Sequence, residues 1–138
     1  MWPPVGVCPD VRGGLGREDE GVPRHVLLVD DHPGFRSMAR ALLEDEGLII
    51  VGEAGDGDEA VVASQRLRPT VVLLDVHLPG EDGFAVAERL AALPGAPVVV
   101  LISSRPETEL RHRLAATSAA GFIAKSDLSA AAIAAVVG

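Results

Sequence analysis

The stretch Val71–Asp75 constrains the fold of this chain more than any other feature. Four apolar residues, two of them β-branched, run directly into a carboxylate, and prolines bound the run at Pro69 and Pro79. A continuous apolar run of this length predicts a strand that is buried on both faces, as in a parallel sheet covered by helices. Ligands bind beyond the carboxyl ends of such strands, so the terminal acid is either a helix cap or a functional group.

The rest of the chain repeats the same pattern. Five apolar runs predict strands at residues 26–29, 48–51, 71–75, 97–102 and 121–124. Each is followed by a stretch that predicts a helix, and these helices begin near residues 33, 56, 84, 106 and 128. This alternation predicts a single α/β domain with a doubly wound, five-stranded parallel sheet flanked by five helices.

Polar residues follow the predicted strands, and right-handed crossovers bring all the strand ends to one edge of the sheet. The residues expected to converge there are Asp30, Asp31, Asp75, Ser103 and Lys125. Glu53 also follows a strand, but we expect it to lie further out. Asp31 could serve as a helix cap before Pro33. The coincidence of five such groups favours a functional site.

Three carboxylates in one crevice repel each other and require a cation. Hard carboxylate oxygens, with no cysteine and no histidine pair, select Mg²⁺, or Mn²⁺ in its place, over Zn²⁺. Lys125 adds a point charge suited to phosphate, and Ser103 adds a hydroxyl donor. These groups would neutralise a phosphoryl group on Asp75, and carboxylates are known covalent nucleophiles.

Composition narrows the partners and the compartment. The 138 residues carry 20 acidic and 12 basic side chains, a net charge of -8, so the domain should repel nucleic acid and anionic membranes. Cys8 is the only cysteine, which excludes an intrachain disulfide. No apolar run approaches a membrane span and no secretory signal is present, so we expect a cytoplasmic protein.

The first 22 residues contain scattered prolines and glycines and have no helical or strand period. We expect residues 1–22 to form a disordered extension, and residues 23–138 to form the folded domain.

Four motifs together resemble the receiver domain of two-component response regulators. They are Val-Asp-Asp-His at 29–32, Leu-Leu-Asp-Val-His-Leu-Pro-Gly-Glu-Asp-Gly at 73–83, Ile-Ser-Ser at 102–104 and Phe-Ile-Ala-Lys at 122–125. The resemblance covers roughly residues 24–138. It implies a flavodoxin-like fold of the receiver type and a phosphoryl switch served by a sensor histidine kinase or a small phosphodonor. It implies no enzyme activity beyond self-catalysed phosphoryl transfer and autodephosphorylation.

The resemblance also implies roles for single residues. Asp75 would accept the phosphoryl group. Mg²⁺ would be held by Asp30, Asp31, Asp75 and the backbone carbonyl of His77. Lys125 would pair with the phosphoryl group.

Further roles concern the switch and dephosphorylation. Ser103 and Phe122 would be the switch residues, with the Ser103 hydroxyl turning toward the phosphoryl group. The side chains of His77 and Arg105 could tune dephosphorylation, although both could equally be solvated loop residues. His32 is interpreted as a loop residue rather than a ligand.

The sequence departs from the family pattern at two positions. Ser104 stands where the family usually has alanine, which bears on access to Asp75. Ser126 follows the lysine where many members have proline, as in the subgroup that carries a helix-turn-helix output domain. Two functions stay open: a stand-alone receiver, or the receiver portion of a DNA-binding transcription regulator whose output domain is absent.

Two weaker alternatives also exist. A phosphatase of the haloacid dehalogenase type also uses a strand-end aspartate and Mg²⁺, but it would need Asp-x-Asp, and Asp30 and Asp31 are adjacent. A degenerate receiver that works without phosphorylation is disfavoured because no site residue is lost.

The last predicted helix runs from Leu128 to Val137, capped by Ser126 or Asp127, and only Ser129 within it is polar. A helix that is apolar all round is normally buried on more than one side, although alanine tolerates exposure. We therefore expect the last two helices to contact a second copy of the chain or an output partner.

Overall fold

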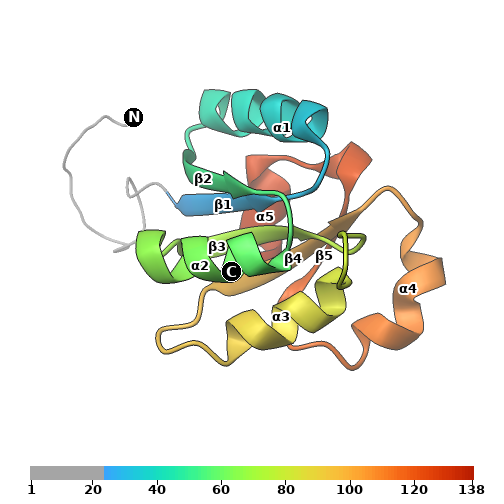
Figure 1. Cartoon of the computed structure of the whole chain (residues 1–138). Helices are drawn as coiled ribbons and strands as arrows, with labels where there is room; N and C mark the ends of the chain where they lie inside the picture. The colour runs from blue at the N-terminus through green and yellow to red at the C-terminus, as the bar shows by residue number, and fades with distance from the viewer. Residues whose placement is uncertain (1–23) are drawn as a thin grey trace.

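A computed structural model describes residues 24–138, in which five strands alternate with five α-helices (Figure 1). The strands are β1 (His25–Val29), β2 (Ile49–Ala54), β3 (Val71–Asp75), β4 (Val98–Ser103) and β5 (Gly121–Ala124). The helices are α1 (Pro33–Asp45), α2 (Gly57–Leu67), α3 (Gly83–Ala91), α4 (Glu107–Leu114) and α5 (Ala130–Val137). The predicted disordered extension, residues 1–22, lies outside the described residues, so that expectation and the domain boundary remain predictions.

The sheet is parallel throughout, in the order β2-β1-β3-β4-β5. The chain passes from β1 outward to β2 and then returns to the other side of β1 for β3. The crossovers therefore run in opposite directions on either side of the β1–β3 pair, which is where a doubly wound sheet opens a crevice. The residues at the carboxyl ends of β1 and β3 meet at this point.

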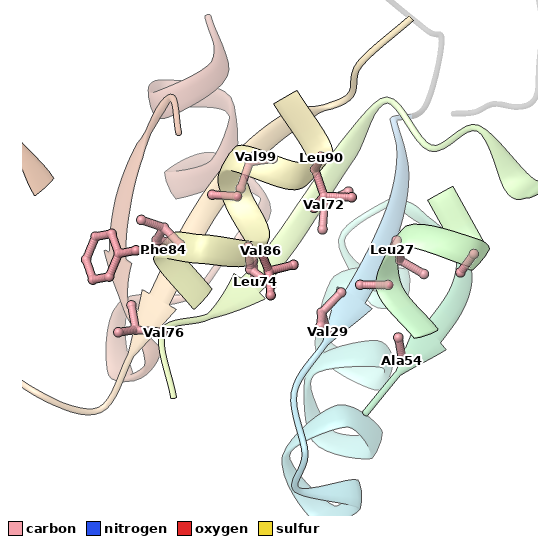
Figure 2. Packing of buried hydrophobic residues seen from close by; sticks show 14 of the residues in the cluster. Leu27, Val29, Ala54, Val72, Leu74, Val76, Phe84, Val86, Leu90 and Val99 are labelled. Carbon is pink, nitrogen blue, oxygen red and sulfur yellow. The ribbon is translucent and has the colours of Figure 1, made fainter. Parts of the chain in front are cut away.

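Two hydrophobic layers cover the sheet. Residues of α2, α3 and α4 pack on one face, where Val72 and Leu74 contribute from β3 (Figure 2). Residues of α1 and α5 pack on the other face, where Val71 and Leu73 contribute from the same strand. All five side chains of β3 are buried, so the interpretation of this run as a strand covered on both faces is confirmed.

The second strand is longer than predicted: it runs over Ile49–Ala54 rather than ending at residue 51. Gly52 pairs with Leu27 of β1, and a Cβ added to it would lie 2.7 Å from the Leu67 side chain. The glycine therefore marks a close approach of α2 to an edge strand rather than the end of that strand.

The start of the last helix was also predicted wrongly. Residues Lys125–Asp127 form a 3-10 turn, and Ser129 caps α5 by accepting a hydrogen bond from the Ala132 amide at 2.9 Å. Neither Ser126 nor Asp127 is the cap. Within α5 only Ile133 is fully buried, so the expected burial on more than one side is not provided by the described part of this chain.

None of the helices in residues 24–138 is both long enough and apolar enough to span a bilayer.

Candidate functional site

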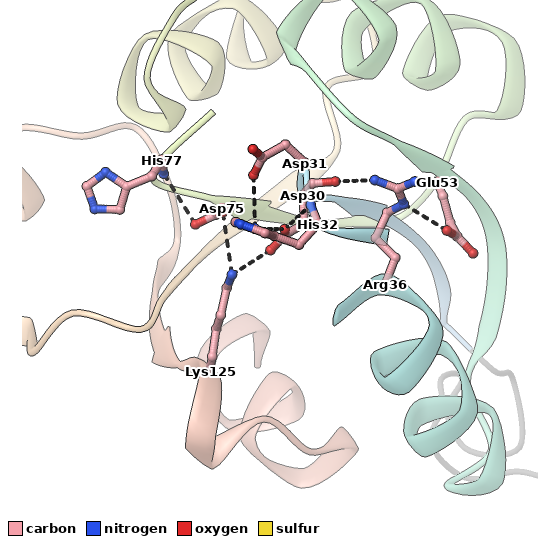
Figure 3. A network of polar contacts seen from close by, with 8 residues as sticks. All are labelled: Asp30, Asp31, His32, Arg36, Glu53, Asp75, His77 and Lys125. Carbon is pink, nitrogen blue, oxygen red and sulfur yellow. Dashed lines mark hydrogen bonds and ion pairs between the residues drawn. The ribbon is translucent and has the colours of Figure 1, made fainter. Parts of the chain in front are cut away.

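Two buried carboxylates face one lysine at the carboxyl edge of the sheet. Asp30 follows β1 and Asp75 ends β3, and their exposed fractions are 1% and 2%. Lys125 follows β5 and reaches across to both, with Nζ 2.6 Å from Asp30 Oδ2 and 3.5 Å from Asp75 Oδ2 (Figure 3). It is the only lysine in the sequence. The expected convergence of these three strand ends is therefore observed.

The loop after β1 adds two more groups to this edge. His32 Nδ1 lies 3.1 Å from Asp30 Oδ1 and 3.1 Å from Asp31 Oδ1, and the His32 amide donates to Asp30 Oδ1 at 2.8 Å. One ligand atom from each of Asp30, Asp31, His32 and Asp75 lies within 4.8 Å of the others. His32 lies in the loop before α1, as predicted, and its side chain is 70% exposed while Nδ1 contacts the two carboxylates.

These donors fit a divalent cation. Three carboxylates meet in one place, two of them are almost fully buried, and Lys125 is the one ammonium that offsets their charge among the described residues. Like charges at such separations cost free energy that a cation removes. Carboxylate oxygens are the ligands that Mg²⁺ and Mn²⁺ prefer.

Burial raises the pKa of Asp75 above its ordinary value. A hydrogen bond from the His77 amide to Asp75 Oδ1, 3.2 Å long, lowers the pKa, while the nearby Asp30 charge raises it and Lys125 lowers it. The dominant cause is desolvation, because a charged carboxylate loses its water when it is enclosed.

The raised pKa predicts a dependence of stability on pH. The folded state holds the Asp75 proton more tightly than the unfolded state, so stability that is present below the ordinary pKa is lost as pH rises through the folded-state pKa. Without divalent cations, Asp75→Asn should therefore raise the free energy of unfolding at neutral pH. Urea unfolding at several pH values tests this. The advantage should shrink toward acid pH, and a variant no more stable than wild type at neutral pH contradicts it.

A second network fixes the backbone at Asp30. Arg36, in the first turn of α1, donates to the Asp30 backbone carbonyl and to Glu53 Oε1, the latter at 2.9 Å. Arg40 donates to Glu53 Oε2 at 2.7 Å. These two arginines, Arg40 foremost, hold the pKa of Glu53 below its ordinary range against the opposing effect of burial. Glu53, on the edge strand β2, therefore holds Arg36 in place. Arg36 in turn positions the Asp30 backbone, a role that the sequence pattern did not indicate.

The predicted switch residues lie near this cluster but not within it. Ser103 is fully buried at the end of β4, and its Oγ accepts a hydrogen bond from the Arg105 amide at 3.0 Å. Phe122 of β5 is partly buried against the layer formed by α2, α3 and α4. Among the described residues no hydrogen bond joins Ser103 to Asp75, although the two lie at the ends of adjacent strands, where Asp75 pairs with Ile102.

The two residues expected to tune dephosphorylation have exposed side chains. The His77 side chain points away from Asp75, although its backbone amide contacts that acid (Figure 3). The Arg105 side chain lies 3.7 Å from Glu109, one turn along the chain. Only the backbone of His77 therefore takes part in the cluster.

Comparison with known proteins identifies the chain. A family model of the response regulator receiver domain matches residues 26–136. The chain belongs to this family. The resemblance seen in the motifs and the predicted receiver fold are confirmed, and nothing in the comparisons supports a haloacid dehalogenase.

Individual receiver relatives agree with this assignment. The transcriptional regulatory protein PdtaR of Mycobacterium tuberculosis is 38% identical over 107 residues, which are 78% of this chain and 52% of PdtaR. The chain thus spans about half the length of the curated relatives it matches. A LuxR-family two-component response regulator from Aurantimonas sp. SI85-9A1 superposes with a TM-score of 0.75 at 26% identity, over 84% of this chain and 86% of that one.

A chain of the CheX-CheY-BeF3-Mg²⁺ complex from Borrelia burgdorferi superposes with a TM-score of 0.73 at 28% identity. The match covers 88% of this chain and 91% of that chain.

Proposed function

We propose that Asp75 accepts a phosphoryl group from a sensor histidine kinase or a small phosphodonor, and that this modification switches a surface that binds a partner. The observation that supports this proposal best is the placement of the Lys125 ammonium beside two buried carboxylates, at 2.6 Å and 3.5 Å. Burying two carboxylates side by side costs free energy, because their charges repel and lose hydration. A lysine beside them offsets this cost and can pair with an incoming phosphoryl group.

Each residue of the cluster has its own role in the proposed reaction. Asp75 is the nucleophile: its carboxylate oxygen forms a bond to phosphorus while the bond to the donor breaks. Asp30, Asp31, Asp75 and the His77 carbonyl would hold Mg²⁺, or Mn²⁺ in its place. When bound, the cation would neutralise charge on the phosphoryl oxygens. Lys125 adds a further positive charge to the same group.

Ser103 and Phe122 transmit the change. The Ser103 hydroxyl accepts one hydrogen bond, from the Arg105 amide, and keeps its own hydrogen to donate to a phosphoryl oxygen. Turning toward Asp75 would give up the contact with Arg105 and disturb the start of α4. The switch is thus a population shift between two arrangements of Ser103, Phe122 and α4. His77 and Arg105 set the access of water to the phosphoryl group.

The position of this switch indicates which surface of the domain binds a partner. We propose that α4 and α5 meet a second copy of the chain or an output partner, and that the domain does not bind nucleic acid or membrane itself. PdtaR, a transcriptional regulatory protein, favours a second candidate function for this chain, the receiver portion of a transcription regulator. The reading frame beyond Gly138 distinguishes the two. In either case, the domain works in the cytoplasm and transfers one phosphoryl group to itself without turnover of an external substrate.

Binding of Mg²⁺ is expected to stabilise the fold, because the cation binds the folded acid cluster and not the unfolded chain. At ten times its dissociation constant, Mg²⁺ should add about 1.4 kcal/mol. Thermal unfolding of wild type and Asp31→Asn with and without Mg²⁺ tests this. The melting temperature of wild type should rise and that of the variant should rise less. A melting temperature that Mg²⁺ leaves unchanged in both proteins contradicts the proposed metal site.

Phosphoryl acceptance itself is tested by intact mass spectrometry after incubation with acetyl phosphate and Mg²⁺. Wild type should gain the mass of one phosphoryl group, and should gain none when Mg²⁺ is removed by a chelator. Asp75→Ala should gain none under either condition. Asp58→Ala, which removes an exposed acid on α2, is the matched control and should behave as wild type. Incorporation into Asp75→Ala, or continuous hydrolysis of a phosphomonoester, would overturn the proposal.

A further inference from the structure

The imidazole of His32 occupies a position in the acid cluster that the proposed Mg²⁺ chemistry does not use. Its Nδ1 lies at the same distance, 3.1 Å, from a carboxylate oxygen of Asp30 and from one of Asp31. Figure 3 shows the ring directed at these two oxygens. Placed between two carboxylates, Nδ1 can only donate a hydrogen bond or bind a cation together with them.

The separations match those between neighbouring ligands of a single metal ion. Bonds from transition-metal ions to nitrogen or oxygen are about 2.0–2.2 Å long, so two ligands at right angles lie roughly 3.0 Å apart. Both separations from Nδ1 equal 3.1 Å. A cation could therefore replace the hydrogen of Nδ1 with little movement of Asp30 or Asp31.

The charge balance of the cluster also favours a cation. Asp30 is 1% exposed, and its Oδ2 pairs with the Lys125 ammonium at 2.6 Å. The other oxygen of Asp30, Oδ1, faces the His32 ring together with an oxygen of Asp31. Among the described residues, the single ammonium of Lys125 offsets three carboxylates, so the oxygens that face His32 are ready ligands for a cation.

We propose that His32 is a ligand for divalent ions that accept nitrogen, such as Mn²⁺, Co²⁺, Ni²⁺ and Zn²⁺, and that it shifts the selectivity of the cluster toward them. Mg²⁺ prefers oxygen and would leave His32 unused. The inference rests on the proposed function only in requiring that the cluster bind a divalent ion. It adds one histidine to a site for which the sequence argument counted carboxylates and no histidine pair.

Calorimetric titration of the metals alone tests this inference. The proteins compared are wild type, His32→Ala, Asp31→Asn and His112→Ala, the last removing an exposed histidine of α4 as the matched control. In His32→Ala, affinity for Ni²⁺ or Zn²⁺ should fall about 10- to 100-fold, as for loss of a group that supports a metal site, while affinity for Mg²⁺ should stay within about threefold. The loss of affinity in His32→Ala should grow from Mn²⁺ through Co²⁺ to Ni²⁺, because the affinity of these ions for nitrogen ligands increases in this order.

The outcomes separate this inference from the proposed function. Equal losses for Mg²⁺ and Ni²⁺ in His32→Ala, or a Ni²⁺ affinity that His112→Ala lowers as much, would overturn the role of His32 while leaving the metal site in place. Binding of neither ion by wild type, or full binding by Asp31→Asn, would overturn the proposed metal site itself. The visible spectrum of bound Co²⁺ gives a second readout, and it should change in His32→Ala and not in His112→Ala.

Discussion

Replacing Lys125 with methionine should lower the free energy of unfolding by about 3 kcal/mol at neutral pH without divalent cations, as expected when one partner of a buried ion pair is removed. The variant leaves Asp30 and Asp75 enclosed, with exposed fractions of 1% and 2%, and without their ammonium. Mg²⁺ should restore part of the loss, because it supplies positive charge to the same acids. The Lys125 amine also lies 4.4 Å from the centre of the Phe35 ring, a contact that methionine partly retains.

The same variant should accept phosphoryl groups about 10²-fold more slowly, because one fixed positive charge is lost where charge develops. Urea unfolding and the rate of mass gain with acetyl phosphate measure the two effects. Arg113→Met is the matched control: it removes a cation that pairs with Asp82 at a half-exposed site, and should cost about 1 kcal/mol or less. If the two variants are equally stable and equally fast, Lys125 has no special role.

Replacing Gly83 with alanine should cost about 3 kcal/mol, the upper part of the range for overpacking. Gly83 begins α3, and its amide donates to the Val76 carbonyl at 2.7 Å. A Cβ at this position would lie 2.8 Å from Val76 Cα and closer still to the Asp75 carbonyl oxygen. Backbone atoms cannot move aside as a flexible side chain can, so the start of α3 would shift away from β3. The rate of phosphoryl acceptance should fall as well, because a shift of α3 also moves the loop that follows Asp75.

Gly34→Ala provides the comparison for this prediction. Gly34 also lies in the first turn of a helix, α1, and a Cβ added there meets no atom within 4 Å. That variant should be unchanged or more stable by up to about 1 kcal/mol, since alanine is the better helix former. Denaturant midpoints measured on both variants decide the question, and equal stability of the two would show that the close approach at Gly83 is tolerated.

The convergence of Asp30, Asp75 and Lys125 could be predicted from the sequence because the rule that locates these residues is local. Asp30, Asp75 and Lys125 each follow an apolar run, and parallel strands joined by right-handed crossovers place such residues at one edge. The prediction needed neither side-chain directions nor loop conformations. The same reasoning placed Ser103 at the end of its strand, but it could not show that the hydroxyl points to the Arg105 amide in this structure.

The remaining features depend on contacts between distant segments or on loop geometry. The direction of the His32 ring is set by the turn after β1, which has no signal in the pattern of apolar residues. Arg36 reaches Glu53 across 17 positions of the chain, and Gly83 is required by another stretch of backbone. The 3-10 turn at Lys125–Asp127 and the extended residue Leu128 after it delay the start of α5 to Ala130. Periodicity reports which face of an element is buried, and it says little about such contacts.

The most direct test of the account is to identify the residue that carries the phosphoryl group. After reaction with acetyl phosphate and Mg²⁺, borohydride reduces an aspartyl phosphate to homoserine, and peptide mass spectrometry locates the altered position. We predict homoserine at position 75 alone. Homoserine at position 30 or 31, or a phosphorylated protein with no homoserine at any aspartate, would contradict the account.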